Sequence, residues 1–123
     1  MINGLILEGL VFGFKDESVK KRKKNLFQLE AEAKILKPYF PKKGEAYKMI
    51  EAETDDFIMQ GEVDYYTDNM LYDLKRTKQF DYWERKSGIL DFLQGYYYPY
   101  IIYCNTGKII PFTYVVYAVD IGI

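Results

Sequence analysis

Two short segments, each with an aspartate, contain the residues with the clearest capacity for chemistry. Residues 61–64 (GEVD) end in Asp64, and residues 72–77 (YDLKRT) contain Asp73 and Lys75. Carboxylates bind divalent cations through oxygen, and a nearby ammonium group can position a water molecule or offset charge on a phosphate. These residue types therefore fit a site for Mg²⁺ or Mn²⁺, provided that the fold brings them together.

Such a site requires the two acids to lie opposite each other in a hairpin. Residues 57–66 and 70–77 are predicted to form two strands joined by a tight turn at residues 68–69 (DN), because Asp and Asn tolerate left-handed backbone conformations. With a two-residue loop, Asp64 lies directly across from Asp73, and like charges placed in this way destabilise a hairpin. A three-residue loop would move Asp64 to the opposite face, so the prediction depends on the register.

The opposed carboxylates need a compensating positive charge. Lys75 is one source, and in the same register it faces Glu62. A bound divalent cation is the other source, with the backbone carbonyl of Leu74 as a further oxygen ligand. An acid-x-Lys triplet alone is weak evidence, since residues 32–34 and 84–86 contain two more, predicted to lie on a helix surface and in a solvated connector. From the residues alone, an ordinary hairpin with a solvated charged face remains the alternative to a metal site.

The composition excludes several other kinds of site. The chain has 123 residues and no histidine, which excludes imidazole bases, Ser-His-Asp triads and His-ligated zinc. Its single cysteine, Cys104, excludes an intramolecular disulfide and a Cys-rich metal site, and agrees with a reducing cytoplasm. Lys and Arg number 17 against 18 Asp and Glu, so a uniformly basic nucleic-acid coat is excluded, whereas a local basic patch is not.

Length and hydropathy predict one soluble domain over residues 1–123. Apolar residues make up 49% and charged residues 28%, a composition typical of a globular protein. No run approaches the ~18 apolar residues that a membrane-spanning helix needs. The apolar residues 2–14 include Glu8 and lack both a basic lead and a small-residue cleavage site, so they do not indicate a signal peptide.

The hairpin belongs to a predicted order of helix, three strands, helix and strand. Helices are expected at residues 2–13 and 24–37, the second ended by Pro38, and a strand at residues 45–53. Residues 78–86 are predicted to be a polar connector and residues 87–98 a helix that Pro99 kinks or ends. After a turn at residues 105–107, the β-branched and aromatic residues 109–120 predict the last strand.

Two further features have open interpretations. The basic run at residues 20–24 is either a solvated surface or a phosphate-contacting patch. The tyrosines at residues 96–103 are predicted to pack the helix onto the sheet, although they could stack on single-stranded bases. The better candidates for exposed stacking flank the proposed site: Tyr65, Tyr66, Tyr72, Tyr82 and Trp83.

The order and spacing of these motifs resemble the PD-(D/E)XK nuclease superfamily. The resemblance rests on Gly-x-x-Asp at residues 61–64, Asp-x-Lys with a following Thr at residues 73–77, and Gln94 ahead of Tyr98. It is closest to the RecB-like and phage-exonuclease branch. Residues 4–8 (GLILE) also resemble the first motif of that branch. The resemblance covers nearly the whole chain. It implies an α/β fold with a restriction-endonuclease-like αβββαβ core, a small mixed sheet flanked by helices.

The resemblance also implies roles for individual residues. Asp64 and Asp73 would ligate the metal, joined by Glu8, and the carbonyl of Leu74 would complete the protein ligands. Lys75 would act on the attacking water and the scissile phosphate. Gln94 and Tyr98 would lie near the site, contacting DNA or orienting the catalytic groups.

The function that follows is metal-dependent hydrolysis of DNA. The resemblance implies a deoxyribonuclease of phage or mobile-element origin, using Mg²⁺ or Mn²⁺ on single- or double-stranded DNA in the cytoplasm of a bacterial or phage-infected cell. It permits a homo-oligomer or a protein partner. One alternative is a non-catalytic binding protein on a nuclease fold, such as a phage-encoded inhibitor or a DNA-binding accessory subunit. Another is a toxin-like module whose basic run contacts RNA.

Overall fold

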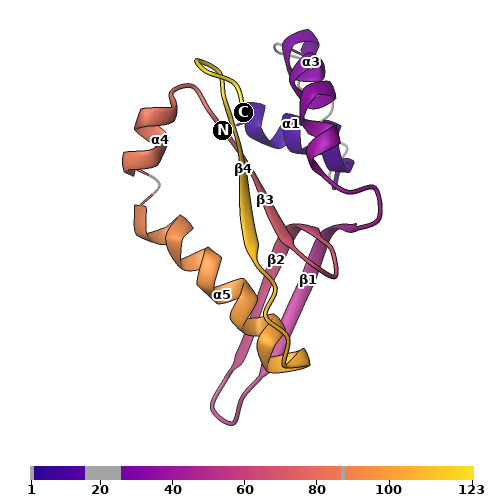
Figure 1. Cartoon of the computed structure of the whole chain (residues 1–123), viewed down its shortest axis with the longest axis vertical. Coiled ribbons are helices and arrows are strands. Elements are labelled where there is room, and N and C mark those ends of the chain that lie inside the picture. Colours follow the sequence, from indigo (N-terminus) through magenta and orange to yellow (C-terminus); the bar gives the residue numbers. More distant parts are fainter. Residues whose placement is uncertain (1, 16–25, 87) are drawn as a thin grey trace.

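A four-stranded mixed sheet forms the centre of the computed structural model, which describes residues 2–15, 26–86 and 88–123 (Figure 1). The strands β1 (Glu45–Glu53), β2 (Ile58–Tyr66) and β3 (Leu71–Thr77) are neighbours in chain order and pair antiparallel. The last strand, β4 (Phe112–Ala118), lies parallel to β3 at the far edge. A parallel pair needs a long crossover connection, and helices provide it here.

The helices cover both faces of this sheet. Before the sheet come α1 (Ile2–Phe12) and α3 (Leu26–Leu36), and the short helix α4 (Phe80–Lys86) and the longer helix α5 (Gly88–Thr106) connect β3 to β4. In Figure 1, α1 and α3 lie together on one side of the strands, while α4 and α5 lie on the other. The chain is therefore a mixed α/β protein with the predicted order of main elements.

Two hydrophobic clusters fix the helices to the sheet. Leu74 of β3 packs with α1 and α3, whereas Leu71 of the same strand packs with α5. Leu71 and Leu74 are an odd number of positions apart, so strand alternation places them on opposite faces. The sheet is thus buried from both sides, with the α1 side and the α5 side separated by the strands.

Two predicted elements differ from the structure. Residues 78–86 do not form a polar connector, because most of them belong to α4, whose Trp83 ring packs at 6.1 Å from the ring of Tyr114. The helix α5 also continues through Pro99 to Thr106. The fully buried Ile101 lies beyond the proline, and its burial offsets the backbone hydrogen bond that proline cannot make.

The end of α5 has a separate cause. Gly107 adopts a φ of 72°, and its N–H donates to the carbonyl of Tyr103 at 2.8 Å. This left-handed residue is a common helix terminator. The prediction of a turn at residues 105–107 was therefore partly correct, because the turn begins only at its last residue.

Within the described residues, no helix has the length and apolar character needed to cross a bilayer. The basic run at residues 20–24 lies outside the described residues.

Candidate active site

The β2–β3 hairpin has the two-residue loop on which the site depends. The N–H of Thr67 donates to the carbonyl of Met70 at 3.0 Å, and Tyr65 and Tyr66 pair with Tyr72 and Leu71. The Thr67 hydroxyl accepts from the N–H of Met70 at 2.9 Å, which stabilises the turn. The register next to the turn is therefore the predicted one, and its continuation by one residue places Asp64 opposite Asp73.

The sheet is interrupted at Asp64. In the β1–β2 register, Ala46 pairs with Tyr65 and Lys48 with Val63, but the position between them, Tyr47 opposite Asp64, carries no pair. Tyr47 has a φ of 53°, which is rare for a bulky side chain. Such interruptions re-aim side chains beside functional sites.

The interruption also changes which side of the sheet β2 faces. Val63 belongs to the cluster on the α5 side, whereas Tyr65, two residues later, packs against the cluster on the α1 side. Regular alternation would have placed both on one face. Asp64 lies at the switch, where β2 and β3 cease to pair, and its carboxylate accepts a hydrogen bond from the Leu74 N–H at 2.9 Å.

The two carboxyl groups meet in the gap between β2 and β3. The carboxyl groups of Asp64 and Asp73 interact electrostatically there, and Oδ2 of Asp73 lies 3.2 Å from Nζ of Lys75. Asp73 is only 8% exposed, so little water reaches its carboxylate. The structure thus brings together the three residues that the sequence motif singled out.

Burial and neighbouring negative charges raise the pKa of both acids. Desolvation is the main cause for each, and it raises the pKa of Asp64 to about 6 and that of Asp73 to about 7. The negative charge of Glu8 further raises the pKa of Asp64, and that of Asp64 raises the pKa of Asp73. Lys75 lowers both pKa values but does not cancel these effects. The pair therefore shares a proton near neutral pH unless another cation enters.

The oxygen donors of the gap suit a hard divalent cation. Because the N–H of Leu74 points toward Asp64, its carbonyl points the same way, into the gap between the strands. Oδ2 of Asp73 is buried and makes no hydrogen bond, although it is ion-paired with Lys75. Two carboxylates and a carbonyl are a sufficient protein contribution for Mg²⁺, which keeps several of its waters.

Glu8 is a neighbour of this pair, on the helix that covers the gap from the α1 side. Desolvation is the main cause of the raised pKa of Glu8, and the charges of Asp73 and Glu62 raise it further. Among the described residues, however, no three acidic side chains are close enough together to enclose a metal ion. Glu8 therefore contributes negative charge to the site, and its role as a direct ligand remains a prediction.

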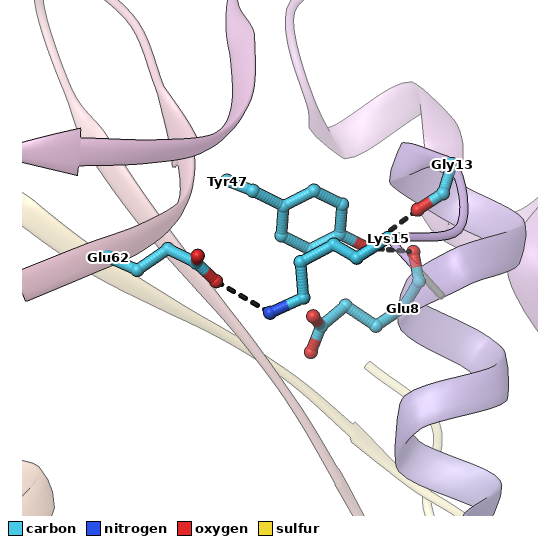
Figure 2. A network of polar contacts seen from close by, with 5 residues as sticks. All are labelled: Glu8, Gly13, Lys15, Tyr47 and Glu62. Carbon is cyan, nitrogen blue, oxygen red and sulfur yellow. Dashed lines mark hydrogen bonds and ion pairs between the residues drawn. The ribbon is translucent and has the colours of Figure 1, made fainter. Parts of the chain in front are cut away.

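Lys15 also belongs to this region, although the sequence motif does not include it. Its Nζ pairs with Oε1 of Glu62 at 2.7 Å, whereas the prediction placed Lys75 opposite Glu62. That prediction was wrong because the pairing of β2 with β3 extends from the turn only to Tyr65 and Tyr72 and does not reach Glu62. Lys75 instead pairs with Asp73. In Figure 2 the Lys15 ammonium lies between the carboxylates of Glu62 and Glu8.

Tyr98 approaches the carboxylates from α5. Its pKa is raised mainly by desolvation, and next by the negative charges of Asp73 and Asp64, so the phenol interacts electrostatically with the pair. A Cβ at Gly61 would lie 2.4 Å from Cε1 of Tyr98. The glycine of the Gly-x-x-Asp motif thus leaves the space that the tyrosine ring occupies against β2.

Gln94 lies one helical turn before Tyr98, on the same face of α5. Its Oε1 is buried and makes no hydrogen bond with any described residue. A buried acceptor without a protein partner is unusual in a folded protein. The structure does not show a contact between Gln94 and the carboxylates, so its predicted role in the site is still untested.

The tyrosines are distributed differently from the prediction. Tyr96, Tyr100 and Tyr103 of α5 are at least half exposed, whereas Tyr98 packs against the hydrophobic cluster on the α5 side of the sheet, as predicted. Tyr65 and Tyr72, predicted to be exposed, instead pack in an aromatic cluster with Phe12 and Phe40. These two rings lie on the α1 side of the sheet, where α1 covers them, and this removes them from solvent.

A buried ion pair supports β3 beside the site. Arg76, which follows Lys75, donates two hydrogen bonds to Glu32 of α3, from Nε at 2.8 Å and from Nη2 at 3.1 Å. Glu32 is 2% exposed, although the sequence placed the triplet at residues 32–34 on a helix surface. Glu32 lies between two other charged residues of α3, so the local sequence gave no sign that it is buried. Its partner Arg76 is 44 positions away along the chain.

Comparisons with family models, with curated proteins and with solved structures give no match to this chain.

Proposed function

We propose that this protein is a metal-dependent nuclease that hydrolyses phosphodiester bonds in DNA. The observation that carries the proposal is that the largely buried carboxyl groups of Asp64 and Asp73 lie next to each other where β2 and β3 separate. The Lys75 ammonium lies 3.2 Å from Asp73. Opposed carboxylates are costly in a hairpin, and a structural role does not require them. The motif resemblance to PD-(D/E)XK nucleases and the element order support the same function.

The residues of the gap divide the work of such a reaction. Asp64, Asp73 and the Leu74 carbonyl would hold Mg²⁺ or Mn²⁺, and the bound cation would supply a water of lowered pKa and stabilise charge on the phosphate. Lys75 would hold a proton at Nζ, where it can orient the attacking water and stabilise the developing negative charge. Tyr98, held against Gly61, would close the α5 side of the site.

The test is cleavage of DNA in the presence of Mn²⁺. Linear and circular duplexes and a single-stranded oligonucleotide would be incubated with the wild-type protein and with Asp73→Asn and Lys75→Met. We expect cleavage by the wild-type protein and a loss of at least about 100-fold in either variant, since each removes a group from the proposed chemistry. Cleavage that survives both substitutions would reject the assignment.

Two controls make the result specific to the site. Asp68→Asn changes an exposed acid in the turn of the same hairpin and should cleave like the wild type. Calorimetry with Mn²⁺ should show binding to the wild type and to Asp68→Asn but not to Asp73→Asn. If the wild-type protein does not bind Mn²⁺ at millimolar concentration and does not cleave DNA, the result would favour the alternative, a binding protein on a nuclease fold.

A further inference from the structure

Lys15 is a cation at the exposed side of the candidate site that the proposed reaction does not use. Its Nζ lies 2.7 Å from Oε1 of Glu62 and 4.9 Å from the ring centroid of Tyr47. Its side chain is 50% exposed, and that of Glu62 is 37% exposed. An ion pair this accessible to water is weak, so the ammonium can exchange one anionic partner for another at little cost.

The backbone that carries Lys15 is held in place by specific contacts. Gly13 ends α1 with a φ of 100°, and its N–H donates to the carbonyl of Gly9 at 2.8 Å. The Tyr47 hydroxyl then donates to the carbonyl of Gly13 at 2.7 Å, as Figure 2 shows. The positive φ of Tyr47 is a strained conformation, and strain of this kind is retained where it positions functional groups.

The acids around the gap oppose the approach of DNA. Four acids lie here, Glu8, Glu62, Asp64 and Asp73, and they repel a phosphate backbone. The Lys75 ammonium is paired with Asp73 on the inner side. Lys15 is also attracted to Glu62, Glu8 and Asp64, which places its ammonium over the open side of the same group.

We propose that Lys15 is a phosphate-binding residue of this site. In the free protein its ammonium pairs with Glu62, and in the complex it contacts a backbone phosphate of the DNA strand that enters the gap. The exchange replaces one carboxylate partner with a phosphate oxygen and leaves the fold unchanged. This inference rests on the proposed nuclease function and adds to it the group that recruits the substrate backbone.

The test measures DNA binding separately from cleavage. A fluorescein-labelled DNA duplex would be titrated in EDTA with the Asp73→Asn protein, and anisotropy recorded at several salt concentrations. Adding Lys15→Gln should weaken binding by about 3- to 10-fold and reduce the slope of log K against log salt by about 0.9, the value for one lost phosphate contact. Lys15→Arg keeps the charge and should restore both quantities.

Lys48 provides a matched control. It is also partly exposed, pairs with Glu45 at 3.3 Å and lies 5.8 Å from the ring centroid of Tyr66, but it is on β1 outside the acidic group. Lys48→Gln should leave the affinity and the slope unchanged. Equal losses in Lys15→Gln and Lys48→Gln would overturn the inference, since they would show only an effect of net charge.

Two further results would separate this inference from the function on which it rests. Cleavage by the wild-type protein together with an unchanged slope in Lys15→Gln would overturn the role of Lys15 alone. Absence of both cleavage and DNA binding would overturn the nuclease proposal, and the role of Lys15 with it.

Discussion

Asp64 and Asp73 are held in an arrangement that opposes folding. Each carboxyl is largely removed from water and lies beside another acid, so ionising both at neutral pH costs free energy. The fold retains them because the strands are fixed by other contacts, including the paired hairpin end at Tyr65 and Tyr72. Locally unfavourable groups that the surrounding structure over-determines are typical of functional sites.

Gly61 is expected to be intolerant of a side chain. In Gly61→Ala the new Cβ would lie 2.4 Å from Cε1 of Tyr98, so the ring or the strand must move. We expect a loss of about 1–3 kcal/mol in the free energy of unfolding, the usual range for overpacking. Urea denaturation followed by circular dichroism would measure it.

Gly95 is the control for this substitution. A Cβ at Gly95 meets nothing within 4 Å, and the residue lies inside α5. Gly95→Ala should therefore be neutral or stabilise the protein by about 0.5–1 kcal/mol, because alanine favours the helix. If Gly61→Ala proves equally harmless, the proposed contact between Gly61 and Tyr98 does not constrain the site.

At the scale of elements, the contact between α3 and β3 determines where Lys75 lies. The bidentate pair between Arg76 and Glu32 joins the two elements, and the Gln28 amide donates a further hydrogen bond to Glu32 at 3.1 Å. Because Arg76 is next to Lys75, this pair also limits how far β3 can shift beneath the site. A helix distant in sequence therefore supports the candidate active site.

Glu32→Ala is expected to destabilise the protein strongly. The substitution leaves the Arg76 guanidinium, whose side chain is 10% exposed, without its partner, and the loss should be about 3–5 kcal/mol. Replacing both residues, as Glu32→Met with Arg76→Met, should recover much of it, since no charge then remains buried. Thermal and urea denaturation of the single and double variants would measure both effects.

The exposed pair Glu45–Lys48 is the comparison for this experiment. Its atoms are 3.3 Å apart, and the Glu45 side chain is 61% exposed. Glu45→Ala should cost less than about 0.5 kcal/mol. A similar small cost for Glu32→Ala would show that the buried pair does not hold α3 against β3.

At the scale of the whole molecule, the raised pKa values link folding to pH. In the folded protein the pKa of Asp64 is about 6 and that of Asp73 about 7, both above the ordinary value of 3.8. A carboxyl with a raised pKa favours the folded state while it is protonated. The contribution is therefore complete below about pH 4 and is lost as the pH rises through 6 and 7.

Asp73→Asn should remove most of this dependence. In EDTA at pH 8 the variant should be more stable than the wild type by on the order of 2 kcal/mol, because one of the two opposed charges is gone. At pH 5 the difference should be clearly smaller, because folded Asp73 is still protonated there and only part of the cost between its unfolded and folded pKa values has accumulated. Urea denaturation at both pH values would measure it, with the exposed turn variant Asp68→Asn as control. A variant that is equally stabilised at pH 5 and pH 8 would contradict the electrostatic explanation.

The local elements were largely predictable because their signals are short in range. Periodicity predicts α1 and β1, and Pro38 predicts the end of α3. The turn residues Asp68 and Asn69 predict the two-residue loop of the hairpin. The juxtaposition of Asp64 and Asp73 was predictable for the same reason, since a hairpin register depends only on its own loop. Helix α4 was not, because it depends on packing against the distant Tyr114, and neither was the continuation of α5 past Pro99, which depends on the burial of Ile101.

The sequence by itself determined most of the elements, the charges that the chain carries and the two acids that face each other near one turn. Only the tertiary structure decided that β2 and β3 separate past Asp64, that Glu62 pairs with Lys15, and that Glu32 is buried on Arg76. It also decided that Tyr65 and not Tyr100 lies inside. The physical reason is distance along the chain: backbone preferences and registers act between near neighbours, whereas burial and ion pairing depend on which remote segments meet.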